Sequence, residues 1–258
     1  MEELQGGREG QVFRFEDKVF RPSGFWSDSI HVLLEHIEGE GFYGAPQSFG
    51  FDDNGNEILS YVSGDVYNYP LKDKIASNEA LISAGELLRK YHDATVSIIS
   101  SDSFTSLKWM LPSRKPYEVI CHGDFAPYNV ALNGSQTVGI FDFDTAHPAP
   151  RIWDVAYAIY CWAPFKTNSY DALGDLSSQS TRAKAFCDAY KLSNSEREKL
   201  VLTMIDRIQT LVNFMQSEAD NGNEAFIENI NDGHHLAYLS DIEYLKENSQ
   251  FITRSLFN

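Results

Sequence analysis

The sequence predicts an α+β protein of two lobes, in which a small antiparallel sheet with one helix precedes a larger, mainly helical part. Two patterns predict this class. Strand-like runs separated by turn residues dominate roughly the first sixty positions, whereas apolar residues recur at helical spacing over most of the remainder. The 258 residues, 43% of them hydrophobic, supply enough apolar material for two lobes that share a cleft.

The elements expected first are a hairpin, a helix and a second pair of strands. A helix is expected over 27–38, with Ser27 or Asp28 as its N-cap, because apolar residues there repeat every three or four positions. Residues 52–56 have the composition of a tight turn. Four segments have strand character: 11–15, 18–21, 47–51 and 57–62.

The second part is expected to contain one early helix, three short strands and then helices to the end. Residues 80–93 place leucine, alanine and tyrosine on one helical face. Asn133-Gly134 is strong turn chemistry between two of the strands. The expected strands are 117–121, 129–132 and 137–141, and the clearest later helices are 181–190 and 195–218.

Composition restricts the partners and the compartment. The net charge of -16 disfavours binding to nucleic acid or to an anionic membrane. It would attract a cationic partner, but it also fits an acidic surface that serves solubility alone. The three cysteines have apolar neighbours and no CxxC spacing, so we expect free buried thiols and no zinc site. The N-terminus lacks the pattern of a signal peptide, and the apolar stretch 155–165 is too short to span a bilayer. We therefore expect a cytoplasmic protein.

The residues that carry chemistry lie between 120 and 144. Asp124 follows a strand in a loop tightened by glycine and proline, Asn129 comes five positions later, and Asp142 ends the next expected strand. Phosphoryl transfer needs an oriented acceptor hydroxyl and cations that neutralise the phosphates. A loop carboxylate suits the first task, and amide and carboxylate oxygens suit Mg²⁺. The pattern therefore predicts a phosphotransferase.

Three motifs make this interpretation more specific. The segment 122–129, H-G-D-x4-N, resembles the protein-kinase catalytic loop H-R-D-x-x-x-x-N, with glycine replacing arginine as in the aminoglycoside phosphotransferase family. F-D-F-D at 141–144 resembles that family's equivalent of the kinase D-F-G, and W-D-V-A at 153–156 resembles its D-L-A element. The resemblance extends from about residue 7 to about residue 215. It implies a two-lobed, protein-kinase-like fold, with a nucleotide-binding lobe at 1–62 and a catalytic and substrate-binding lobe at 63–258.

The resemblance also implies roles for individual residues. Asp124 would be the base that accepts the proton of the substrate hydroxyl, and Asn129 and Asp142 would bind Mg²⁺. His122 and Asp154 would support the catalytic loop, although Asp154 also fits a plain helix cap.

Further residues are implied for the nucleotide and the substrate. Arg21 would bind the phosphates of ATP or GTP. The backbone of the linker, Ser60, Tyr61 and Val62, would pair with the base. Asp144 would assist a second metal ion or the substrate's ammonium group, or else would be a solvated carboxylate.

Two departures from the kinase pattern stand out. Arg21 occupies the position of the phosphate-binding lysine, and arginine is not a simple replacement for lysine. Its usual glutamate partner on the first helix is not evident: Ser29 or His31 aligns with that place, and Glu35 lies a turn later. The glycine-rich segment 6–10 also does not match G-x-G-x-x-G.

These observations leave alternatives open. D-F-D-T at 142–145 also resembles the nucleophile motif of haloacid-dehalogenase-type phosphatases, in which Asp142 would form an aspartyl-phosphate. The two departures would also fit a kinase-like binding module that has lost activity. For an active enzyme, Asp124, Asp142 and Asp144 would make the floor of the cleft acidic. This predicts a small cationic acceptor, such as an aminoglycoside or another amine-bearing alcohol. The oligomeric state is not determined by the sequence.

Overall fold

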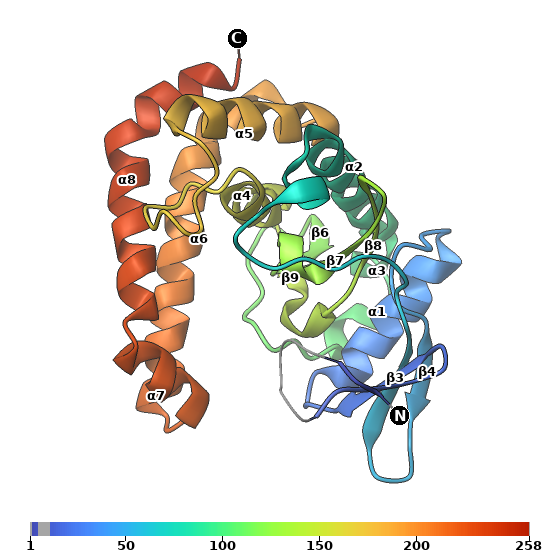
Figure 1. Ribbon diagram of the computed structural model, residues 1–258. Helices are drawn as coiled ribbons and strands as arrows, with labels where there is room; N and C mark the ends of the chain where they lie inside the picture. Colours follow the sequence, from blue (N-terminus) through green and yellow to red (C-terminus); the bar gives the residue numbers. More distant parts are fainter. Residues whose placement is uncertain (1, 5–10, 258) are drawn as a thin grey trace. The chain divides into compact units, whose positions relative to one another are not determined.

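The computed structural model describes residues 2–4 and 11–257 (Figure 1). The glycine-rich segment 6–10 lies outside the described residues. Contacts between Cα atoms divide the chain into two compact units. Unit 1 comprises Met1–Val66, Glu86–Phe125 and Asn129–Arg151, and unit 2 comprises Tyr67–Gly85, Ala126–Tyr128 and Ile152–Asn258. The expected lobe boundary between residues 62 and 63 stays a prediction.

Unit 1 begins with an antiparallel sheet in the order β1-β2-β3-β5-β4. The predicted hairpin turn at Glu16-Asp17 joins β2 to β3, and Glu16 takes a left-handed conformation there. Asp52 closes the second predicted turn by accepting hydrogen bonds from the backbone of Asn54 and Asn56. The strands are β1 (Glu2–Glu3), β2 (Phe13–Phe15), β3 (Lys18–Pro22), β4 (Ser48–Phe51) and β5 (Asn56–Ser60).

Helix α1 (Ser27–Gly39) follows β3 and buries the predicted apolar stripe. The expected side-chain cap is wrong. The N-cap position is Trp26, and no side chain caps the helix there. Ser27 instead donates its hydroxyl hydrogen bond to Glu57, so this side chain is engaged with the sheet and not with its own helix.

The rest of unit 1 consists of short elements around the catalytic loop. Strand β6 (Val119–Cys121) enters the loop and pairs with β9 (His147–Ala149). Strand β7 (Val130–Asn133) leaves it and pairs with β8 (Gln136–Ile140) across the predicted Asn133-Gly134 turn. The helical pieces are α3 (Val96–Ile99), η2 (Phe104–Ser106), η4 (Phe143–Thr145) and the second half of α2 (Asn78–Ala94).

Unit 2 is mainly helical. Long helices α6 (Asn194–Asp220) and α8 (His234–Ser255) pack against each other, and α7 (Glu224–Asn231) connects them (Figure 1). The start of α6 is held by a capping box between Ser193 and Glu196. The remaining elements are α4 (Arg151–Trp162), α5 (Leu176–Tyr190), η1 (Asp73–Ala76) and the first half of α2.

Two further features concern the state of the cysteines and the hydropathy of the helices. Cys121, Cys161 and Cys187 are buried thiols that form no disulfide, and burial raises the pKa of the Cys187 thiol to about 12. None of the helices in the part of the chain that the structure describes is both long enough and apolar enough to cross a membrane.

Candidate active site

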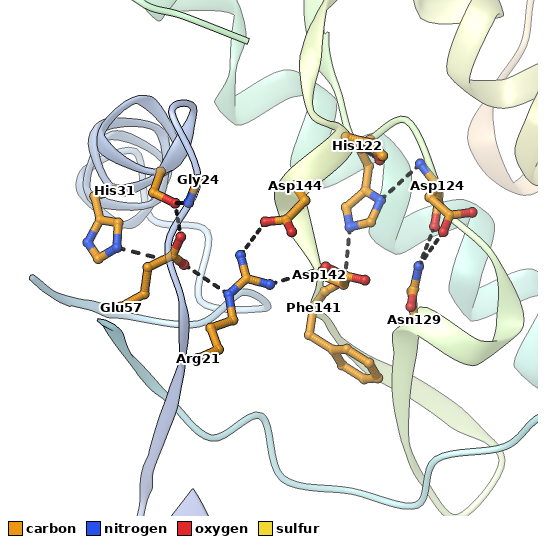
Figure 2. Close-up of polar contacts among 12 residues, drawn as sticks. Arg21, Gly24, His31, Glu57, His122, Asp124, Asn129, Phe141, Asp142 and Asp144 are labelled. Carbon is orange, nitrogen blue, oxygen red and sulfur yellow. Dashed lines mark hydrogen bonds and ion pairs between the residues drawn. The ribbon is translucent and has the colours of Figure 1, made fainter. Parts of the chain in front are cut away.

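Residues 122–125, in unit 1, are linked to the end of β8 by hydrogen bonds of His122. Its Nε2 donates to the carbonyl oxygen of Phe141 at 3.0 Å, and its Nδ1 accepts from the backbone N–H of Asp124 at 3.3 Å. The imidazole is fully buried. These contacts determine which nitrogen carries the proton and link the loop to the residue before Asp142 (Figure 2).

Gly123 is required by the backbone of this loop. Its φ is +85°, and a Cβ at this position would lie 2.3 Å from the carbonyl oxygen of Thr145. The hydroxyl of Thr145 also donates to the carbonyl oxygen of His122 at 3.0 Å. A side chain cannot be accommodated between these groups, which explains the glycine where protein kinases have arginine.

Asp124 is held by Asn129. The Nδ2 of Asn129 donates to the carboxylate Oδ2 of Asp124 at 2.9 Å and to its carbonyl oxygen at 3.0 Å. Because the amide nitrogen is engaged in this way, the amide oxygen is the atom that Asn129 offers to a cation. The five-residue spacing thus brings together an oriented carboxylate and a candidate metal ligand.

Asp142 and Asp144 converge on one guanidinium. The chain between them is not extended, because residues 143–145 form a 3₁₀ turn and Asp142 takes a left-handed conformation (φ 64°). The carboxylates nevertheless meet at Arg21. Its Nη1 lies 3.2 Å from Oδ1 of Asp142, and its Nη2 contacts Oδ1 of Asp144 (Figure 2).

Arg21 has a third carboxylate partner that sequence reasoning missed. Its Nε donates to Oε2 of Glu57 at 2.9 Å, and the two residues lie directly opposite each other on β3 and β5. None of the three helix positions considered from the sequence supplies this carboxylate. No local signal pairs Arg21 with Glu57, because the pairing depends on which strands become neighbours and in what register.

The electrostatics of this cluster favour a bound cation. Burial by itself lowers the pKa of Arg21, but the charges of Asp144, Glu57 and Asp142 outweigh it and raise the pKa. Desolvation by the surrounding chain, and then the charge of Asp144, raise the pKa of Asp142. Arg21 offsets part of that effect, whereas Asp124 adds to it. The carboxylates of Asp142 and Asp144 and the amide oxygen of Asn129 are hard oxygen donors of the kind that Mg²⁺ prefers.

The other predicted site residues are placed elsewhere. Ser60, Tyr61 and Val62 line a cavity of about 270 Å³ in unit 1, together with residues 44–47 and 138–139. Asp154 is buried in the first turn of α4, in unit 2. The predicted roles of these four residues stay predictions.

Comparison with known sequences gives two matches. A model of the phosphotransferase enzyme family matches residues 103–190, which include the catalytic loop and both aspartates after β8. The trifolitoxin immunity protein of Rhizobium leguminosarum bv. trifolii is 31% identical over 211 residues, which are 78% of this chain and 78% of that protein.

Comparison with solved structures shows the fold. A choline/ethanolamine kinase family protein from Mesorhizobium loti is 16% identical, with a TM-score of 0.66, and the match covers 100% of this chain and 92% of the other. Aminoglycoside 2'-phosphotransferase-IIIa, solved as a complex with GDP, is 14% identical, with a TM-score of 0.56 and coverage of 96% and 92%. The predicted kinase-like fold is therefore confirmed.

Proposed function

The chain belongs to the phosphotransferase enzyme family, and we propose that it transfers the γ-phosphate of ATP or GTP to a hydroxyl of a small, amine-bearing molecule. The proposal rests chiefly on one observation. The carboxylate of Asp124 is oriented by the amide nitrogen of Asn129 at 2.9 Å, while the amide oxygen and the carboxylate of Asp142 are available as ligands for a cation. This combination supplies a base and a metal site within one compact unit.

The chemistry assigned to the chain is positioning and proton transfer. The carboxylate of Asp124 accepts the proton of the acceptor hydroxyl as its oxygen bonds to the γ-phosphorus, and the bond to the departing nucleoside diphosphate breaks. Arg21 binds the donor phosphates through its terminal nitrogens. Asn129, Asp142 and Asp144 would hold Mg²⁺, which neutralises phosphate charge when bound.

The acceptor is assigned by charge. Asp124, Asp142 and Asp144 gather at the site, and the whole chain carries a net charge of -16. An ammonium group is stabilised by such a potential, whereas an anionic alcohol is repelled. An aminoglycoside or another amino alcohol therefore suits the site better than a sugar phosphate.

A thermal-shift titration tests the donor. ATP or GTP with Mg²⁺ should raise the melting temperature of the wild-type protein, because a ligand that binds only the folded state stabilises it. Asp142→Ala should lose the magnesium-dependent part of the shift. Asp53→Ala, an exposed carboxylate in the β4–β5 turn, is the matched control and should retain it. If neither nucleotide shifts the wild-type protein, the inactive binding module replaces this proposal.

Phosphoryl transfer is tested by Asp124→Ala. Loss of a general base should lower kcat by about 10²- to 10⁴-fold while the nucleotide-induced shift remains. The assay presents a panel of aminoglycosides and amino alcohols beside neutral and anionic alcohols. Transfer that persists in Asp124→Ala would refute the base assignment, and transfer confined to uncharged or anionic acceptors would refute the charge argument.

A second candidate function is protection of the cell against a toxic compound. Because the 31%-identical relative is a trifolitoxin immunity protein, we also propose that this chain protects cells against a toxic compound. The test expresses wild-type protein and Asp124→Ala in a susceptible bacterium exposed to trifolitoxin or to aminoglycosides. Protection by the wild type alone would support inactivation by phosphorylation, and protection by both would indicate sequestration without transfer.

A further inference from the structure

The guanidinium of Arg21 is hydrogen-bonded at Nε and ion-paired at its two terminal nitrogens. Its Nε donates to Glu57, whereas Nη1 and Nη2 reach Asp142 and Asp144 (Figure 2). An arginine side chain loses rotamer entropy when it is ordered, and the hydrogen bond at Nε restricts the side chain before any ligand binds. The anchoring leaves the terminal edge of the guanidinium directed at the carboxylates of the proposed metal site.

Glu57 is itself firmly held. Its side chain is fully buried. Oε1 accepts from the hydroxyl of Ser27, whose oxygen accepts in turn from the backbone N–H of Gly24 at 2.9 Å. Nε2 of His31 lies 4.0 Å from Oε2. Helix α1 thus contributes a hydroxyl and an imidazole that surround this carboxylate.

Helix α1 contributes no carboxylate to Arg21. All residues of this helix are described, and its acidic side chains have other surroundings. Glu35 is exposed and accepts from Ser48 at 3.3 Å, Glu38 accepts from Gln47 at 2.5 Å, and Asp28 is exposed. In protein kinases the phosphate-binding lysine pairs with a glutamate of the corresponding helix.

We propose that Glu57 is the positioning residue of Arg21, and that this strand carboxylate takes the place of the kinase helix glutamate. The inference rests on the proposed function, because it assumes that Arg21 binds donor phosphates. Arg21 and Glu57 are opposite partners in the β3–β5 ladder, so hydrogen bonds between the strands set their separation.

The test compares two isosteric substitutions. Glu57→Gln removes the buried charge opposite Arg21. The matched control, Glu35→Gln, removes the carboxylate of α1 that lies one turn after the place of the kinase glutamate. Calorimetry measures the Kd of Mg·ATP and Mg·GTP for each. Glu57→Gln should weaken nucleotide binding about tenfold or more, as expected when a charge-assisted hydrogen bond is lost. Glu35→Gln should change it by less than about twofold.

A double-mutant cycle separates positioning from general destabilisation. If Glu57 acts only through Arg21, adding Glu57→Gln to Arg21→Ala should change the nucleotide Kd by less than about twofold. If Glu57→Gln does not fold, Ser27→Ala, which removes a donor to Glu57, should produce a smaller loss in the same direction. Additive effects, or a larger effect from Glu35→Gln than from Glu57→Gln, would overturn the proposal.

A nucleotide-free readout distinguishes this inference from the proposed function. The Nε–H of Arg21 should exchange slowly with solvent in the wild type and faster in Glu57→Gln, as followed by ¹⁵N NMR. Slow exchange in a wild-type protein that binds neither nucleotide would refute the donor role and, with it, the positioning role, while confirming the pair. Nucleotide binding that is unaffected by Glu57→Gln would overturn the positioning role alone.

Discussion

Asn129 orients Asp124 through two hydrogen bonds from one amide nitrogen, 2.9 Å to the carboxylate and 3.0 Å to the carbonyl oxygen. The same side chain offers its oxygen to the proposed metal. In the proposed mechanism, one residue therefore links the position of the proposed base to the occupancy of the proposed cation site.

Asn129→Ala should reduce catalysis in two separable ways. Loss of the amide oxygen should weaken Mg²⁺-dependent nucleotide binding, and loss of the amide nitrogen should lower kcat by about 10²-fold because the base is no longer held. Steady-state kinetics over a range of Mg²⁺ concentrations checks this. Excess Mg²⁺ should restore the KM of the nucleotide but not kcat, and full recovery of both would show that Asn129 acts only on the metal.

Gly123→Ala should be much more destabilising than Gly134→Ala. Both glycines have a left-handed φ, +85° and +64°, but a Cβ at Gly123 meets the oxygen of Thr145 whereas Gly134 faces open space. Chemical denaturation should give a loss of about 1 kcal/mol for Gly134→Ala, from backbone conformation alone. Gly123→Ala should cost about 3 kcal/mol or more. Equal losses would show that the catalytic loop can move away from Thr145.

His31 should make stability fall more steeply in acid. Desolvation lowers the pKa of this imidazole below its ordinary 6.5, against the opposing effects of Glu57 and Glu35. The folded state therefore binds a proton less readily than the unfolded state. The stability associated with neutral His31 is fully present above pH 6.5 and is lost as the pH falls below that value.

Urea unfolding at several pH values between about 5 and 8 measures this effect. The wild-type free energy of unfolding should fall more steeply below pH 6.5 than that of His31→Gln. His36→Gln, in the same helix but with a side chain 24% exposed, is the control and should follow the wild type. Parallel curves for the wild type and His31→Gln would contradict the prediction.

Asp241 should be a stability residue of unit 2, although no role for the chain beyond residue 215 was evident from the sequence. Its carboxylate accepts from the hydroxyl of Tyr160 at 2.7 Å and from the backbone and hydroxyl of Thr167 at 2.6 and 2.7 Å. Asp241→Ala should lower the free energy of unfolding by about 3 kcal/mol, because buried donors lose their acceptor. The exposed Asp232→Ala should change it by less than about 0.5 kcal/mol.

Most secondary structure could be predicted because it depends on neighbours a few positions apart. The strand character of β2 and β3, the apolar stripe of α1 and the Asn133-Gly134 turn were all evident from the local sequence. The predicted N-cap of α1 was wrong because of a contact with a distant part of the chain. The hydroxyl of Ser27 could cap a helix, but it donates its hydrogen bond to the buried carboxylate of Glu57 on β5.

The sequence by itself determined the kinase-like class and the order of Asp124, Asn129 and Asp142, since these depend on motif spacing within a short stretch of chain. Only the tertiary structure decided that Glu57 is the partner of Arg21 and that Asp142 and Asp144 converge across a 3₁₀ turn. Arg21 and Glu57 are 36 positions apart and separated by α1. Their contact depends on which strands become neighbours and in what register, and packing of the whole sheet sets both.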